Sequence, residues 1–302
     1  MSSAKVLHVR SAFGRSLQET YLLAAHPDED LDDQGRPRRD ARTLVLKLQG
    51  KRAVYQEQLP VRLGSCWYSS TGVAYCGAID SRVIYKYAAG SWTEEQFSEK
   101  PVDFVSYIFA VPGESLASDT VFLATPKQIF IRQGGKWLST PALGEGFPFQ
   151  MDGTRGDQVY IGGPELGMWD GKKLVALDAP EDDNLGSLAL SSDDRLVGGS
   201  RAVSVSTESG GWERIATPPR IKTFFMFARF RDEVYALSGT KGVLRVYPGK
   251  ASVVTQPLEA YWLASVGDGL VAVGEDVVFV YDGTSWSEVD IPKCELGKVP
   301  DV

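Results

Sequence analysis

The stretch Val277–Val289 reads V-V-F-V-Y-D-G-T-S-W-S-E-V and decides the fold. Apolar and polar residues alternate up to Tyr281, the chain turns at Asp282-Gly283, and a second short strand returns through Trp286. Such alternation is typical of a half-buried strand, and glycine supplies the backbone conformation that a tight hairpin turn needs. We therefore predict a β-hairpin in this stretch.

The same hairpin recurs along the chain, because a turn glycine appears seven times at separations of 34 to 44 residues. These glycines are Gly50, Gly90, Gly134, Gly171, Gly210, Gly249 and Gly283. A proline closes the returning strand each time; the prolines are Pro60, Pro101, Pro141, Pro180, Pro218, Pro257 and Pro292. Proline lacks the N–H that a sheet ladder needs and belongs at a strand end or on an edge. Because the turn glycines and the closing prolines recur together along the chain, they indicate a structural repeat.

Each repeat also contains an earlier hairpin, such as the one between Cys66 and Cys76. Four short strands in about 40 residues are the signature of a propeller blade. We predict an all-β, seven-bladed β-propeller of four-stranded antiparallel blades that fills one domain, residues 1–302. The expected blades are 4–60, 61–101, 102–141, 142–180, 181–218, 219–257 and 258–292. We expect Val6–Val9 to open the first blade, no strand exchange between the termini, and a loosely held tail over 293–302.

Short motifs resemble known propeller repeats. The pairs Gly162-Gly163 and Gly198-Gly199 look like kelch repeats. The run Ser191–Val197, S-S-D-D-R-L-V, is similar to the inner turn of WD-type repeats, which often carry a Trp-Asp pair like Trp169-Asp170. Ser206–Trp212 resembles a degenerate Asp-box of sialidase-type propellers, with Glu208 in place of the aspartate. The resemblance implies the propeller fold, and no subfamily is matched well enough to imply its activity.

Composition and charge reduce the number of functional classes to which the protein can belong. The chain has 32 Lys and Arg against 39 Asp and Glu, a net charge of −7, and no basic stripe that would favour nucleic acid. The first ten residues lack a signal-peptide core, and no apolar run reaches the 18 or so residues of a membrane span. We expect a cytoplasmic monomer that needs no cofactor, nucleic acid or membrane.

Catalytic and metal chemistry are poorly supported. His8 and His26 are the only histidines, and no G-x-S-x-G nucleophile motif is present. The longest insertion, the loop 26–41 in the first blade, places Asp28, Asp30 and Asp32 in alternation as in a calcium loop. Glycine comes too late for an EF-hand and no bidentate glutamate follows, so we expect a solvated loop without metal. A long loop on a rigid scaffold remains a candidate binding element.

The cysteines allow a geometric prediction. If the turn lies at Ser70-Thr71-Gly72, Cys66 and Cys76 fall directly opposite each other on adjacent strands. A cytoplasmic location favours two buried free thiols.

The strongest candidate binding site is aromatic. Large rings follow the closing prolines at Trp67, Tyr107, Phe147, Phe224 and Trp262, where a propeller would bring them to the mouth of its channel. The charged residues around them include Asp103, Arg220, Lys222 and Glu259. Such rings give a large contact area at a small entropic cost, although packing between blades, as in propeller cores generally, is the favoured interpretation of them. The tryptophans of the turns, Trp92, Trp137, Trp212 and Trp286, recur with the repeat and are interpreted as structural.

We therefore predict a non-catalytic binding or scaffold propeller that engages a protein partner, with a basic partner favoured by the acidic charge. One version is an immunity-type antagonist of a toxin or enzyme whose active site the loop 26–41 occupies. The alternative is a carbohydrate-binding or glycoside-cleaving propeller. That alternative needs paired carboxylates, for which Asp103, Asp152 and Glu259 are candidates by position.

Overall fold

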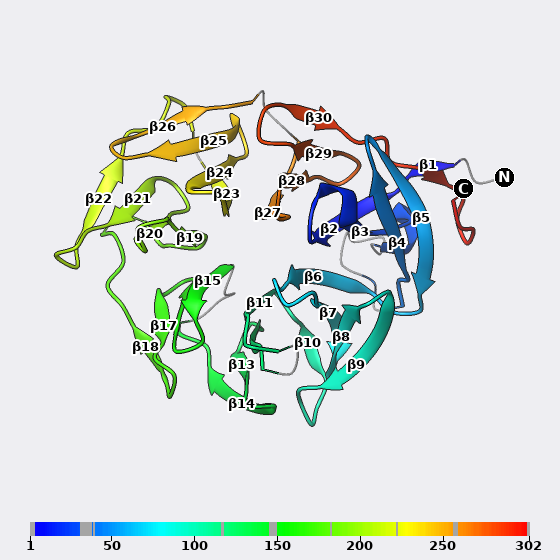
Figure 1. The fold of residues 1–302 in the computed structure, drawn as a ribbon, viewed down its shortest axis with the longest axis horizontal. Helices are drawn as coiled ribbons and strands as arrows, with labels where there is room; N and C mark the ends of the chain where they lie inside the picture. The colour runs from blue at the N-terminus through cyan, green and yellow to red at the C-terminus, as the bar shows by residue number, and fades with distance from the viewer. Residues whose placement is uncertain are drawn as a thin grey trace. The chain divides into compact units, whose positions relative to one another are not determined.

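The computed structural model describes residues 4–30, 38, 40–115, 118–144, 150–181, 183–221, 223–255 and 259–300. Its strands form seven antiparallel blades of four main strands each, in chain order (Figure 1). The protein is an all-β, seven-bladed propeller, so the predicted fold class is confirmed. The chain groups into unit 1, Met1–Val105 with Ala264–Val302, and unit 2, Ser106–Leu263, which are described separately.

Unit 1 contains three blades and both helical segments of the described residues. Blade 1 consists of β2 (His8–Gly14), β3 (Thr20–Ala25), β4 (Thr43–Gln49) and β5 (Arg52–Leu59). Blade 2 consists of β6 (Leu63–Tyr68), β7 (Ala74–Ser81), β8 (Val83–Ala88), β9 (Ser91–Gln96) and the additional β10 (Val102–Phe104). Blade 7 consists of β27 (Trp262–Ser265), which crosses the unit boundary, β28 (Leu270–Val273), β29 (Val278–Tyr281) and β30 (Trp286–Glu288). The helical segments are the 3-10 turn η1 (Leu17–Glu19) and α1 (Pro27–Asp30), and no helix among the described residues is long and apolar enough to cross a membrane.

Unit 2 contains four blades. Blade 3 consists of β11 (Tyr107–Val111), β12 (Thr120–Ala124), β13 (Gln128–Gln133) and β14 (Lys136–Pro141). Blade 4 consists of β15 (Gln150–Arg155), β16 (Gln158–Gly162), β17 (Gly167–Trp169) and β18 (Leu174–Ala176). Blade 5 consists of β19 (Leu188–Leu190), β20 (Leu196–Gly198), β21 (Val203–Ser206) and β22 (Trp212–Ile215). Blade 6 consists of β23 (Phe224–Phe230), β24 (Glu233–Ser238), β25 (Gly242–Tyr247) and β26 (Lys250–Val253).

The repeat seen in the sequence is the outer hairpin of each blade. All seven turn glycines have positive φ, between 58° and 93°, a conformation that side chains disfavour. Strands in the middle of a blade are buried on both faces, as in β28, whereas outermost strands such as β14 are largely exposed. The core therefore lies between neighbouring blades, where apolar side chains of two sheets meet.

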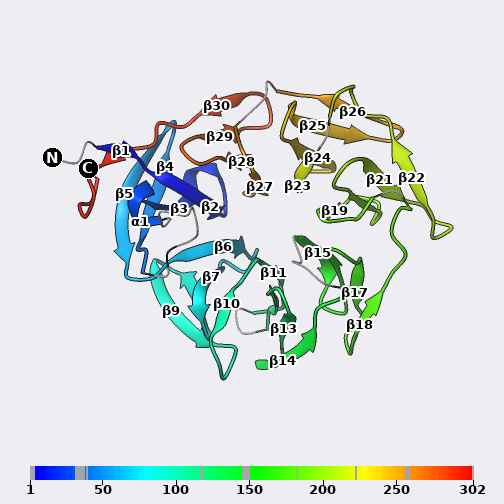
Figure 2. The ribbon, with the colours of Figure 1, turned by 180° about the vertical axis from the view of Figure 1, so that it is seen from behind.

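The chain ends differ from the expectation. β1 (Lys5–Val6) pairs antiparallel with β31 (Lys293–Cys294), and Leu7 N donates to Pro292 O at 3.3 Å. The two terminal strands lie side by side in both views (Figures 1 and 2). The prediction of a loosely held tail is therefore wrong, and the inner strand of blade 1 begins at His8 rather than at Val6.

Blade 2 gains one strand that was not expected, and its two cysteines lie where they were predicted. Residues 102–104 form β10, which pairs with β7 and so belongs to blade 2, whereas the third blade was expected to begin at 102. Cys66 and Cys76 lie directly opposite each other on β6 and β7, as predicted. Both are buried free thiols, and burial raises the pKa of the Cys76 thiol well above its ordinary value.

Candidate functional site

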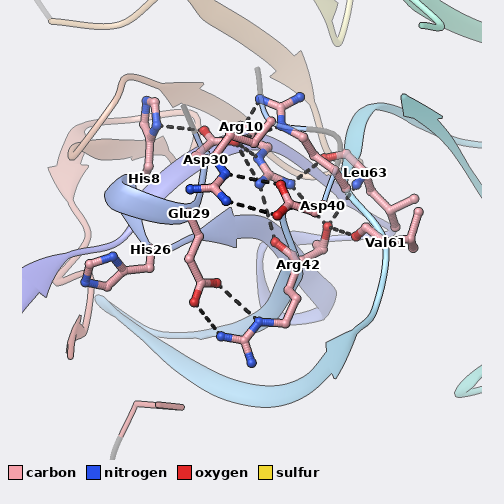
Figure 3. Close-up of polar contacts among 12 residues, drawn as sticks. His8, Arg10, His26, Glu29, Asp30, Asp40, Arg42, Val61 and Leu63 are labelled. Atoms are coloured by element: carbon pink, nitrogen blue, oxygen red, sulfur yellow. Dashed lines mark hydrogen bonds and ion pairs between the residues drawn. The ribbon is translucent and has the colours of Figure 1, made fainter. Parts of the chain in front are cut away.

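The first part of the insertion loop is built into the fold of unit 1. Asp30, the last residue of α1, is 1% exposed, and its carboxylate faces His8 and Arg10 (Figure 3). Its Oδ2 lies 2.8 Å from His8 Nδ1, and its Oδ1 lies 2.8 Å from Arg10 and 2.7 Å from Arg62. Burial raises the pKa of Asp30, but the hydrogen bond from His8 and the two guanidinium charges outweigh it and hold the pKa well below its ordinary value. The expectation of a solvated loop is wrong for Asp30.

The surrounding bonds make this cluster structural. Arg10 also donates to the carbonyl of Leu63 at 2.9 Å and to Thr43 Oγ1 at 3.2 Å, which joins α1, β2, β4 and β6. Asp28 instead forms an exposed ion pair with Lys5 at 2.8 Å, and Asp32 lies outside the described residues. Within the described residues, no three His, Cys, Asp or Glu side chains are grouped to hold a metal ion.

The predicted aromatic positions have different environments, each considered within its own unit. Tyr107 and Phe224 are 7% and 4% exposed and belong to the core of unit 2, so their rings are not available to a partner. Trp67 on β6 and Trp262 on β27 are half-buried. Phe147 lies outside the described residues. The expectation of a rim of accessible rings is therefore wrong for Tyr107 and Phe224.

The predicted charged positions are mostly exposed. Asp103 lies on β10 in unit 1, and Glu259 precedes β27 in unit 2. Arg220 is exposed with a positive φ of 71°, an unusual conformation for a residue with a side chain. Lys222 lies outside the described residues.

The structure exposes two aromatic side chains beside predicted positions that the sequence did not single out. Phe225, next to the buried Phe224, is 41% exposed, and Tyr261, next to Trp262, is 39% exposed. The pairing of β23 with β24 also shifts register between Phe224 and Met226, a bulge that the strand pattern alone does not reveal.

Asp152, a candidate acid of the carbohydrate alternative, is a partly buried carboxylate on β15. One oxygen accepts the N–H of Leu190 at 2.7 Å, and the other accepts the N–H of Gly153 at 2.8 Å. Burial raises its pKa to about 6, although these two bonds act in the opposite direction. Both oxygens are thus engaged: Oδ2 joins β15 to β19, and Oδ1 bonds the next residue of β15.

A groove of unit 2 opens between blades 5 and 6 and is here called the acidic groove. Its volume is about 440 Å³, within the usual size range of ligand sites. Apolar side chains from both blades line it; they are Val197, Val205, Ile215, Val234 and Val246. The carboxylates that line it are Asp193, Glu213, Asp232 and Glu233.

The charge of the acidic groove is negative. Asp193 accepts from Ser191 Oγ and Arg195 Nε, both at 2.6 Å, and these bonds hold its pKa below the ordinary value. Glu233 forms an ion pair with Arg245. Glu213 and Asp232 are exposed, and no ion pair reaches either carboxylate from the residues that the structure describes. The groove thus carries two uncompensated negative charges beside valine and isoleucine side chains that belong mostly to the core between the blades.

A second cavity of unit 2, here called the arginine pocket, lies on the other side of blade 5 and has a volume of about 740 Å³. The exposed Arg201 and Arg214 line it together with the acidic residues Asp178, Glu181 and Asp183, and neither arginine has an ion-pair partner in the described part of the chain. Trp212 Nε1 donates to the carbonyl of Asp178 at 3.0 Å, which fixes the indole in the pocket wall. Asp183 Oδ2 accepts the N–H groups of residues 200–202 at 2.8 to 3.0 Å and shapes the pocket edge.

The outer strand of blade 5 separates the two cavities. Trp212 and Arg214 of β22 line the arginine pocket, whereas Glu213 and Ile215 line the acidic groove. Successive side chains of a strand point to opposite faces, which explains the alternation. The four residues were not among the predicted binding residues, and Trp212 was interpreted as purely structural.

Comparisons with known proteins show similar folds only. Neither a family model nor a curated protein matches the chain. The structure of YCF48 bound to D1 peptide has a TM-score of 0.65 at 12% identity and covers 94% of both chains. Virginiamycin B lyase from Staphylococcus aureus has a TM-score of 0.63 at 11% identity, covering 91% of this chain and 96% of its own. The WD40 repeats of RRP9 have a TM-score of 0.62 at 14% identity, covering 90% of each chain. Similarity at such low identity extends to the fold and not to a shared activity.

Proposed function

We propose that this protein is a non-catalytic binding module that engages a basic segment of a protein partner through the acidic groove. The observation that carries the proposal is the pair of uncompensated carboxylates, Glu213 and Asp232, that line the groove. Such carboxylates favour lysine and arginine of a partner and speed association. The net charge of −7 acts in the same direction.

The similar structures are compatible with this proposal through their fold. One of them is described as bound to a peptide and another as WD40 repeats, while the lyase is an enzyme with the same architecture. In this chain, Trp67, Trp262, Arg220 and Glu259 remain candidates for additional contacts with the partner. The antagonist version loses part of its basis, because Asp30 of the loop 26–41 is buried in ion pairs. The carbohydrate alternative is not supported by Asp152, whose two oxygens already bind backbone N–H groups.

The test is capture of a partner from native lysate at low and high salt, with three forms of the tagged protein. The first form is the unaltered chain, and the second carries Glu213→Lys and Asp232→Lys. The third carries Glu99→Lys and Asp276→Lys, which makes the same charge change at exposed sites of unit 1.

We expect one stoichiometric partner that weakens at high salt. The groove variant should bind it about tenfold more weakly, since each rim charge contributes up to about 1 kcal/mol and both are reversed. The variant of unit 1 should bind as the unaltered chain does. No partner at either salt, or equal loss in both variants, would rule out the acidic groove as the binding site.

A further inference from the structure

The arginine pocket contains a buried hydroxyl group that bonds nothing in the chain. Ser204 of β21 lines the pocket and is 4% exposed. Its Oγ forms no hydrogen bond with any residue that the structure describes. Buried polar side chains are nearly always hydrogen-bonded, so an unpartnered hydroxyl on the wall of a cavity indicates a place for an atom from outside the chain.

Positive charge lies beside this hydroxyl. Ser204 is directly opposite Arg214 of β22, and opposed residues of neighbouring strands carry their side chains on the same face. Arg201, two residues before β21, lines the same pocket, and neither guanidinium has an ion-pair partner in the described part of the chain. A guanidinium keeps its charge and binds a carboxylate through parallel N–H donors. The hydroxyl and the two guanidiniums therefore form a subsite for a carboxylate.

The negative charges of the pocket come from the segment that joins β18 to β19. Its acidic lining residues are Asp178, Glu181 and Asp183. Asp183 is already engaged, because its Oδ2 accepts the N–H groups of residues 200–202 at 2.8 to 3.0 Å. Asp178 and Glu181 are exposed, and among the described residues no ion pair reaches either carboxylate. These two side chains offer acceptors for an ammonium group.

The two sets of charges do not neutralise each other, since no ion pair joins the two arginines to the two free carboxylates within the described pocket lining. The carboxylates repel an anion and the arginines repel a cation, whereas a ligand with one charge of each sign is attracted by both sets. Trp212 Nε1 donates to the carbonyl of Asp178 at 3.0 Å, so the ring is held in place beside the carbon atoms of such a ligand. The volume of about 740 Å³ is within the usual range of small-molecule sites.

We propose that the arginine pocket binds a small zwitterion, a free amino acid or a short peptide with charged ends. Its carboxylate accepts hydrogen bonds from Ser204, Arg201 and Arg214, and its ammonium group donates to Asp178 and Glu181. This site goes beyond the proposed function, because it takes a small molecule and lies on the opposite face of β22 from the acidic groove.

The test is isothermal titration calorimetry of the full chain with glycine, diglycine and triglycine, each at up to about 10 mM. The tightest binder is then compared with two matched probes, one acetylated at its amino group and the other amidated at its carboxyl group. Each cap removes one charge and leaves the rest of the probe unchanged.

We expect at least one zwitterion to bind, and either cap should weaken it at least about tenfold, since a charge-assisted hydrogen bond is lost. Arg214→Gln and Asp178→Asn should each weaken the zwitterion about tenfold for the same reason. Arg15→Gln, the same change at an exposed arginine of unit 1, should have no effect. Ser204→Ala should weaken binding with an unchanged Tm, because the hydroxyl bonds no described residue.

Three results would overturn the proposal. The first is a capped probe that binds as tightly as the zwitterion, and the second is no binding of any of the zwitterions by calorimetry or by a ligand-induced rise in Tm. The third is a Ser204→Ala variant that melts at a lower temperature and binds the zwitterion as before, because the hydroxyl would then be structural. None of these results affects the proposed function, since partner capture depends on Glu213 and Asp232.

Discussion

Asp30→Asn should destabilise the protein strongly. The substitution keeps the shape of the side chain but removes the negative charge that Arg10 and Arg62 share. These guanidiniums are 6% and 11% exposed, so water cannot replace the lost carboxylate. Removing one partner of a buried ion pair typically costs about 3–5 kcal/mol. For 302 residues the entropy of unfolding is about 0.6 kcal/mol per kelvin, so Tm should fall by about 5–8 °C.

The assay is thermal unfolding followed by circular dichroism, with Asp28→Asn as the matched control. Asp28 pairs with Lys5 at the surface, where 42% of its side chain is exposed, and exposed ion pairs contribute little. The low pKa of Asp30 lies below the ordinary value of about 3.9 for an unfolded chain. Its stabilisation is therefore complete above about pH 5 and declines only as the pH falls below about 4. If Asp30→Asn melts within 1 °C of the unaltered chain at neutral pH, the cluster does not hold the blade together as we infer.

The remaining predictions concern Asp152 and the C-terminal strand. The pKa of Asp152 is raised to about 6, so its protonation favours the folded state, and the free energy of unfolding should rise as the pH falls from about 6 to about 4. Urea titrations at several pH values measure this dependence, and Asp152→Asn should remove it. An unchanged pH dependence in the variant would contradict the assignment to Asp152. A chain that stops after Pro292 loses the hydrogen bonds between β31 and β1 and the burial of Cys294. We expect its free energy of unfolding to fall by about 2 kcal/mol and its Tm to fall by about 3 °C. An unchanged melting curve would show that the terminal strand pair is dispensable.

Hairpins could be predicted from the sequence because their determinants are local. A turn glycine such as Gly283 needs positive φ, and the residues around it alternate over a few positions on either side. The opposition of Cys66 and Cys76 followed from the same local counting. The pairing of Lys5–Val6 with Lys293–Cys294 could not be found in this way, because the partners lie at opposite ends of the sequence and each strand is only two residues long.

The aromatic positions show where local reasoning ends. Phe224 and Phe225 are identical in type and adjacent, and the pattern of apolar residues does not distinguish them. Successive side chains of β23 point to opposite faces, so one ring packs against Phe227 while the other is exposed. A shift by one residue exchanges the two faces of a strand, so a small error in register reverses the assignment of core and surface. Asp30 was misjudged for a related reason, since its partners Arg10 and Arg62 are distant in sequence.

The four residues of β22 show both what local sequence reasoning can find and what it cannot. Their order, W-E-R-I, already separates the positions of the acid and of the arginine onto opposite faces, because the period of a strand is two. What the sequence does not contain is the composition of the opposite wall of each cavity. Asp232 and Glu233 of blade 6 add negative charge on the side of Glu213. On the side of Arg214 the cavity holds Arg201 together with Asp178, Glu181 and Asp183, so the charges there are mixed. The negative charges gathered beside Glu213 oppose folding slightly, and a bound cationic segment would relieve this repulsion.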